Sequence, residues 1–205
     1  MLATVAAPSS VSIYGIAIGQ PLSIPECRAK PPSEIDQKIA KRLATRGLTN
    51  FMDSPFPAYE PASGSPCYKR LSKAVLGTPI GTEKVHIAFP IGERLAGNDG
   101  WDAAVQMIGG RVEYLKFRTR GRAWQDEDLA TFNQKFGVPV SVTPIALQNG
   151  FGAKYEALKA TWQPAPGIVA IFESWISDTG GNFGVGTPEA ERLFWQMPAS
   201  PAKPL

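Results

Sequence analysis

Apolar and polar residues alternate along several short stretches of the chain, which is the pattern of half-buried β-strands. Residues 84–89 show this alternation and Pro90 ends it, while 13–18 form an apolar run that suits a short strand or a turn of helix. The stretches 105–108 and 112–119 flank a Gly-Gly pair, which predicts a β-hairpin. We expect three further strands, over 155–162, 167–176 and 182–187. Short connections between them favour antiparallel pairing.

The clearest helix is expected over 125–136. Acidic side chains fill its first turn, where they interact favourably with the helix dipole. Leu129, Phe132 and Phe136 recur at helical spacing and form one apolar face. Gly137 follows as a stop signal. This segment should pack its apolar face on the sheet formed by the neighbouring strands.

A second short helix is expected over 33–46, where Ser33 can cap the start and Gly47 ends the pattern. Few helices and clustered strands together predict the α+β class: an antiparallel β-sheet meander with one or two short helices packed on one face. The expected organisation is a signal-peptide remnant or disordered N-terminus over 1–12, a single α+β domain over 13–197, with subdomains 13–104 and 105–197 as an alternative, and a disordered tail over 198–205.

Composition narrows the class of protein without naming an activity. The chain has 205 residues, 43% of them hydrophobic and 19% charged, so it can bury a substantial core. It has 20 Gly and 19 Pro, which suits a turn-rich fold rather than a helical bundle. No stretch approaches the roughly 20 apolar residues of a membrane-spanning helix. Collagen, coiled coil and transmembrane protein are therefore excluded.

Two cysteines, Cys27 and Cys67, stand 40 residues apart in proline-rich surroundings. Two cysteines and a single histidine are too few for a zinc site, so we predict a disulfide bond and no metal; two separate buried thiols are the alternative. The bridge would pin one end of 49–68, which we predict to be a long loop because of its four prolines. The first ten residues resemble the end of a secretory signal, although the basic segment and most of the apolar one are missing. These features favour a periplasmic or secreted protein over a cytosolic one.

The formal charge of +3 is unevenly spread. Residues 1–122 carry 16 Lys and Arg against 10 Asp and Glu, whereas 123–205 carry 5 against 8. The excess is concentrated in 111–122, which holds five cations and one acid. Nucleic-acid-binding domains usually show a stronger bias, so we expect no nucleic-acid partner.

Several cations share one side of the predicted strand that begins at residue 112. In an extended chain their side chains, with Tyr114, project to the same face, and Trp124 follows. Arginine and aromatic side chains together can grip an acidic protein or another anion. The alternative is a solvated outer face, with the acids at 126–128 pairing with the cations. The candidate binding residues are Tyr114, Lys116, Arg118, Arg120, Arg122 and Trp124.

No catalytic motif is identified in the sequence. Asp178-Thr179-Gly180 matches the loop of aspartic proteases, but it occurs once and too near the end of the chain, which favours an ordinary turn. The Gly-rich segment 180–187 lacks the lysine and the order of a phosphate loop, and is expected to be a strand with bulges. His86 is the only histidine and is expected on the surface, opposite the apolar side of its strand. Catalytic residues and cofactors are therefore not expected, although a hydrolase with an unrecognised site stays an alternative.

Two stretches carry a resemblance to small bacterial envelope proteins. These are Gly15–Pro21, with the sequence GIAIGQP, and 129–139, where a short helix ends in the turn Lys135-Phe136-Gly137-Val138-Pro139. Over 105–190 the pattern resembles the small outer-membrane lipoprotein of the barrel-assembly machinery and the folds related to β-lactamase-inhibitor protein. The lipobox of the first family is missing, because Cys27 follows Ile-Pro-Glu. The resemblance implies a non-enzymatic, protein-binding role in the envelope and transfers no functional residue.

The function expected from the sequence is thus that of an exported envelope protein that binds another macromolecule, either an acidic protein or another envelope component. A periplasmic inhibitor or immunity protein of an enzyme is the closest alternative.

Overall fold

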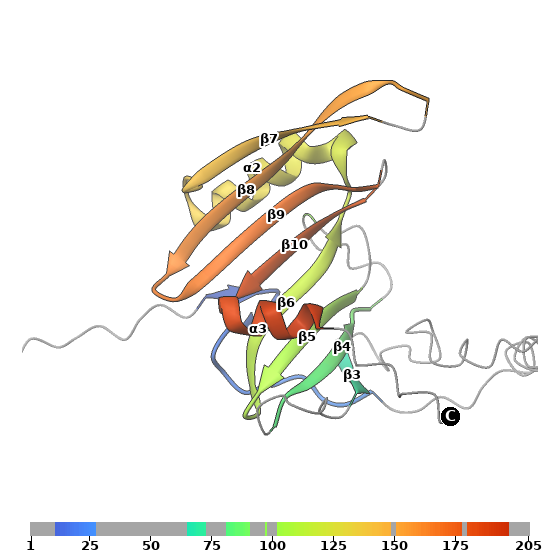
Figure 1. Ribbon diagram of the computed structural model, residues 1–205. Helices are drawn as coiled ribbons and strands as arrows, with labels where there is room; N and C mark the ends of the chain where they lie inside the picture. The colour runs from blue at the N-terminus through green and yellow to red at the C-terminus, as the bar shows by residue number, and fades with distance from the viewer. Residues whose placement is uncertain are drawn as a thin grey trace, which may run out of the picture.

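A computed structural model describes residues 11–27, 65–72, 81–90, 97, 102–148, 151–177 and 180–196 (Figure 1). Eight strands form one antiparallel sheet in the order β3-β4-β5-β6-β10-β9-β8-β7. Their bounds are β3 Cys67–Ser72, β4 Glu83–Ala88, β5 Asp102–Ile108, β6 Arg111–Thr119, β7 Ser141–Gln148, β8 Lys154–Ala165, β9 Ile168–Ser177 and β10 Gly180–Gly186. A separate hairpin pairs β1 (Ser12–Ile13) with β2 (Ile16–Ala17). The helical segments are η3 (Arg122–Trp124), α2 (Gln125–Phe136) and α3 (Pro188–Trp195).

The α+β class and the antiparallel sheet are confirmed. The hairpin between β5 and β6 turns at Gly109 and Gly110, both with positive φ, as a two-residue turn of this twist requires. The prediction of a loop over 49–68 is wrong at Cys67 and Tyr68, because these residues already belong to β3, which pairs with β4. The expected helix over 33–46 lies outside the described residues, as do 1–10, 28–64 and 197–205.

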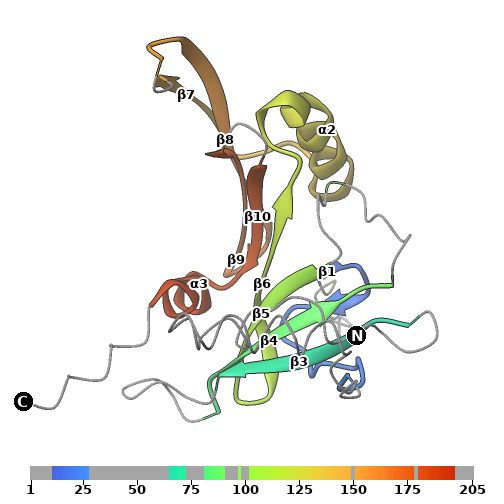
Figure 2. The same cartoon turned by 90° about the vertical axis from the view of Figure 1, so that its right-hand side faces the viewer.

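The two α-helices lie on opposite sides of the sheet, which Figure 2 shows edge-on. Phe132 of α2 packs on Phe117 of β6, with ring centroids 6.3 Å apart. Phe194 of α3 packs on Tyr114 of the same strand, at 5.2 Å. Because successive strand residues point to opposite faces, Phe117 and Tyr114 mark two different faces. We call these the α2 face and the α3 face.

The main hydrophobic core lies on the α2 face. Phe132 is 3% exposed and its ring stacks on Phe183 at 4.1 Å, with Phe172 and Trp162 also in contact. Leu129 and Phe136 are partly buried against the same cluster. The predicted helix over 125–136, with its apolar side against the sheet, is therefore confirmed.

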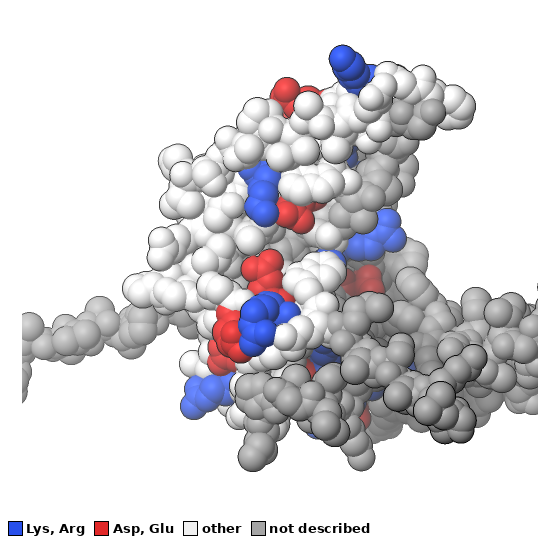
Figure 3. All heavy atoms as spheres, viewed as in Figure 1, with Lys and Arg blue, Asp and Glu red and all other residues white. Residues whose placement is uncertain are grey.

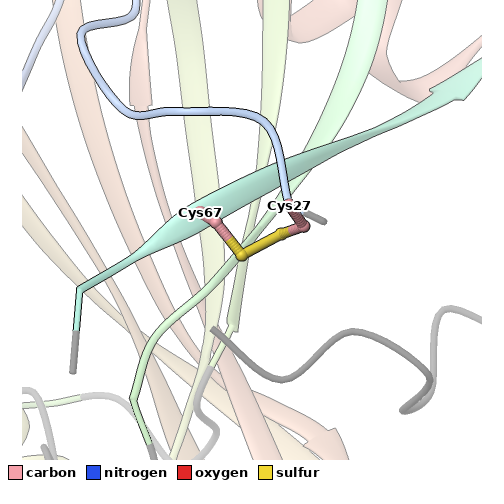
Figure 4. The surroundings of a disulfide bond; sticks show 2 residues. All are labelled: Cys27 and Cys67. Atoms are coloured by element: carbon pink, nitrogen blue, oxygen red, sulfur yellow. A yellow bond between two sulfur atoms is a disulfide. The ribbon is translucent and has the colours of Figure 1, made fainter. Parts of the chain in front are cut away.

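The disulfide bond between Cys27 and Cys67 is present, with the two Cα atoms 4.8 Å apart (Figure 4). It lies at the outer edge of the sheet, because β3 is an end strand. The backbone reinforces this attachment: the Cys27 amide donates to the Tyr68 carbonyl at 2.8 Å, and the Tyr68 amide donates to the Pro25 carbonyl at 2.9 Å. The segment around Cys27 thus covers part of an edge that would otherwise be open to pairing with another chain.

Gly184 in β10 provides space for the Tyr114 side chain on the α3 face. A Cβ atom at this position would overlap the Tyr114 hydroxyl and approach the ring carbon Cζ to 2.8 Å. We expect Gly184→Ala to lower the free energy of unfolding by about 1–3 kcal/mol, because an extra methyl group in a filled site forces the ring to move. Urea denaturation measures the loss. Asn182→Ala, on the same face of the same strand, should change stability by less than about 0.5 kcal/mol, and equal effects of the two variants would contradict the close packing of Tyr114.

Candidate functional site

The candidate cations do not lie on a single strand face. Strand β6 ends at Thr119, so Lys116 and Arg118 project from the α3 face, whereas Arg120 and Arg122 follow after the strand. The expectation that one extended strand aligns all four cations is therefore wrong beyond Arg118. The reason is that the extended conformation ends at Thr119. The chain then bends into η3, which leads directly into α2. Each side chain has to be considered by its own contacts.

Helix α3 covers the first part of the predicted surface. Tyr114 is only 5% exposed and packs on Phe194. The Lys116 ammonium lies 3.8 Å from the ring centroid of Trp195, a cation–π contact. Burial lowers the pKa of Lys116; the Glu173 carboxylate opposes this effect and the nearby Arg118 adds to it. Tyr114 and Lys116 are thus engaged by the chain itself.

Arg120 binds the N-terminal turn of α2. Its guanidinium donates to the Asp128 carboxylate at 2.5 and 2.9 Å and contacts Glu127 at 3.3 Å. The Asp128 side chain is fully buried. Burial raises the pKa of Asp128, and the hydrogen bonds from Arg120 oppose that rise. Arg120 therefore has a structural partner, which is the alternative foreseen for the acids at 126–128.

Arg118 and Arg122 are different, because both are exposed. Within the described ranges neither guanidinium has a carboxylate within ion-pair distance. The Arg122 guanidinium instead lies 4.9 Å from the ring centroid of Tyr155 on β8. Trp124 is 46% exposed, and the Arg120 guanidinium lies 4.7 Å from the centroid of its ring. Two unpaired arginines and an exposed indole remain of the six candidate residues.

The register of the sheet places Arg118 at one end of a polar row on the α3 face. Arg118 is opposite Asn182, Asn182 is opposite Glu173, and Glu173 is opposite Lys159. Lys159 and Glu173 form an ion pair at 3.0 Å, so Glu173 already has a cationic partner. Tyr155 lies four residues before Lys159 on β8 and therefore points to the same face. Arg118 and the Arg122–Tyr155 pair thus belong to the same side of the sheet.

The surface charge in this view is scattered. Figure 3 looks onto the α3 face, and its described part is mostly white, with separate blue and red groups rather than one continuous basic area. A nucleic-acid footprint requires clustered cations along a groove or stripe. On this face the cations are instead interspersed with acids and uncharged residues.

His86 is not the surface residue expected from the alternation of its strand. Its side chain is only 14% exposed, and Nε2 lies 2.6 Å from the Asp102 carboxylate on β5. The prediction identified the correct face of β4 but could not show what lies around it. A carboxylate can orient an imidazole, which is one part of a hydrolytic relay. The structure places no serine, threonine or cysteine of the described residues in hydrogen-bond contact with this ring.

No group of three or more His, Cys, Asp and Glu residues in the described part of the chain is arranged to hold a metal ion. Among the described helices, none has the length and apolarity needed to cross a bilayer. Comparisons with family models, with curated proteins and with solved structures find no match to this chain. The resemblance to envelope proteins over 105–190 therefore stays a prediction.

The sequence interpretation missed α3, although it decides which candidates are accessible. Thr187 caps this helix by accepting a hydrogen bond from the Ala190 amide, and Pro188 occupies its first turn. This Thr-Pro pair is a recognisable helix-start signal. The predicted strand over 182–187 includes Thr187 as its last residue, whereas β10 stops at Gly186.

Proposed function

We propose that this is a non-enzymatic protein of the bacterial envelope, exported to the periplasm or secreted, that binds an acidic macromolecule through Arg118, Arg122 and Trp124. The observation that carries the proposal is that Arg118 and Arg122 are both exposed and have no carboxylate partner within the described ranges, while Trp124, two residues after Arg122 in the chain, is exposed as well. Arginine and tryptophan are the side chains that most often dominate the energy of protein interfaces. Tyr155 supports this arrangement by holding the Arg122 guanidinium over its ring.

An acidic partner follows from the charges that surround the arginines. The nearest carboxylate in the polar row, that of Glu173, is held by Lys159, so it leaves the charge of Arg118 available. A partner carboxylate can accept two parallel hydrogen bonds from a guanidinium, which makes it the best-matched ligand group. Localisation outside the cytoplasm is supported by the disulfide bond, because such bonds persist in oxidising compartments.

The test uses poly-L-glutamate as an acidic polypeptide of defined chemistry. Binding at low salt is measured by the change in intrinsic tryptophan fluorescence. We expect saturable binding that Arg118→Glu/Arg122→Glu weakens at least about tenfold, because each reversal replaces an attraction with a repulsion. The melting temperature should be almost unchanged, since neither arginine has an ion pair in the described part of the chain.

The matched control is Lys135→Glu/Lys154→Glu, which changes the net charge equally. Lys135 belongs to α2, and Lys154 lies an odd number of residues from Tyr155, so it points to the α2 face. This control should retain poly-L-glutamate binding within about twofold. If both double variants lose the same affinity, binding depends on net charge alone and the assignment to Arg118 and Arg122 is wrong. Arg120 is left intact because it holds the buried Asp128.

A further inference from the structure

A cavity of about 310 Å³ lies between the β1–β2 hairpin and α2, away from the proposed binding surface. Figure 2 shows β1 on the same side of the sheet as α2. Its lining includes the apolar and aromatic residues Ile13, Tyr14, Phe117 and Phe132 and the exposed polar residues Gln134 and Lys135 of α2. Its size is at the lower end of the range of small-molecule sites.

The walls of the cavity are part of the core and are therefore preformed. Ile13, Phe117 and Phe132 are each 2–3% exposed. The Tyr14 ring packs on Phe117 at 5.3 Å and on Phe89 at 5.8 Å. The three buried residues therefore form a rigid floor, and a ligand would rest mainly on the half-buried Tyr14 ring without having to order it, which favours binding.

The backbone at Tyr14 is strained, and the strain places an aromatic ring at the cavity. Tyr14 has φ of +51°, a conformation that side chains other than Gly, Asn and Asp rarely adopt. With Gly15 at +79° it forms the two-residue turn between β1 and β2. Strained residues of this kind tend to occur at ligand-binding sites. The strained turn thus directs the Tyr14 ring onto Phe89 and Phe117, beside the cavity, rather than into solvent.

The rim of the cavity supplies one positive charge. Lys135 is exposed, and in the described residues its ammonium has no ion-pair partner. Gln134 beside it is exposed and offers both a donor and an acceptor. Apolar walls with one cation at the mouth match a ligand that has an apolar body and a single negative charge. They disfavour a sugar, which needs many polar partners, and an amine, which Lys135 would repel.

We propose that this cavity binds a small organic acid with an apolar body, whose carboxylate lies at Lys135 and whose hydrocarbon part contacts the half-buried Tyr14 ring. This site is independent of the arginine surface, because it lies on the α2 face and uses none of the same side chains.

Octanoate is the probe, with octanamide and octylamine as a neutral and a cationic analogue of the same chain length. Binding is followed by NMR of the Ile13 methyl groups in the full-length protein. We expect octanoate to shift the Ile13 signals saturably at one site. Octanamide should bind about fivefold more weakly, since it lacks the charge-assisted contact, and octylamine more weakly still.

Two surface variants test the geometry without disturbing the core. Lys135→Glu should weaken octanoate binding about tenfold and reduce the preference for octanoate over octanamide. Gln134→Trp should obstruct the mouth of the cavity and weaken the binding of octanoate, octanamide and octylamine alike. Lys154→Glu, an equal charge change away from the cavity, should leave the affinities unaltered. Absence of saturable Ile13 shifts, equal binding of octanoate and octylamine, or unchanged binding in Lys135→Glu would each overturn the proposal. None of these results would bear on poly-L-glutamate binding by Arg118 and Arg122.

Discussion

Phe132→Ala should lower the free energy of unfolding by about 3–5 kcal/mol, since it removes a large buried ring and leaves a cavity. The Phe132 ring is 3% exposed and stacks on Phe183, with ring centroids 4.1 Å apart. It also contacts Phe172 at 5.3 Å and Trp162 at 6.1 Å. Because these partners belong to β10, β9 and β8, one side chain joins α2 to three neighbouring strands.

Urea denaturation of the disulfide-bonded protein measures this loss as a fall in the unfolding midpoint. Phe132→Leu fills part of the space and should cost clearly less than Phe132→Ala. Val138→Ala provides the exposed control: Val138 is 90% exposed, so we expect a change below about 0.5 kcal/mol. A loss below about 1.5 kcal/mol for Phe132→Ala would show that α2 is held to the sheet by contacts other than this ring.

The same helix shows which parts of the fold are predictable from sequence. Leu129, Phe132 and Phe136 repeat at the helical period, three acids precede them and Gly137 follows, so local signals and tertiary packing agree. The hairpin at Gly109-Gly110 is predictable for a similar reason, because the turn needs two residues with positive φ. Elements of this kind carry their own start and stop signals.

The sequence pattern does not predict strand β7, and its residues explain why. Val142 is 49% exposed and Pro144 interrupts the pattern, so the segment lacks the regular alternation of a half-buried strand. Proline is tolerated there because β7 is an end strand of the sheet. The strand exists because it pairs with β8 over eight residues, from Ser141 to Gln148, which is a tertiary property.

The candidate site was less predictable than the fold. Alternation along β6 and β4 assigns Lys116 and His86 to a face, but it does not show which other element covers that face. In the structure Trp195 of α3 covers Lys116, and Asp102 of β5 binds His86. Accessibility is set by contacts between segments distant in the sequence, so the unpaired state of Arg118 could be recognised only from the structure.

Loss of the Cys27–Cys67 bond should lower the free energy of unfolding by about 4 kcal/mol, which is the chain-entropy expectation for a loop closed over this separation. The two cysteines stand 40 residues apart, so the reduced unfolded chain gains much conformational freedom. The bond also holds the segment around Cys27 against β3, where the Cys27 amide donates to the Tyr68 carbonyl. Both effects act at the edge of the sheet.

The measurement compares urea unfolding of the oxidised protein with that of the Cys27→Ser/Cys67→Ser variant. Hydrogen exchange should locate the effect, with faster exchange of the Cys27 and Tyr68 amides and little change in the Phe172 amide at the centre of the sheet. Adding reductant to the double variant is the control and should change nothing, since the chain has no other cysteine. A stability difference below about 1 kcal/mol would mean that the backbone hydrogen bonds of Tyr68 hold the segment without the bond. In that case the chain-entropy effect of the disulfide would be offset elsewhere, and the attachment of the Cys27 segment to β3 would rest on its backbone pairing.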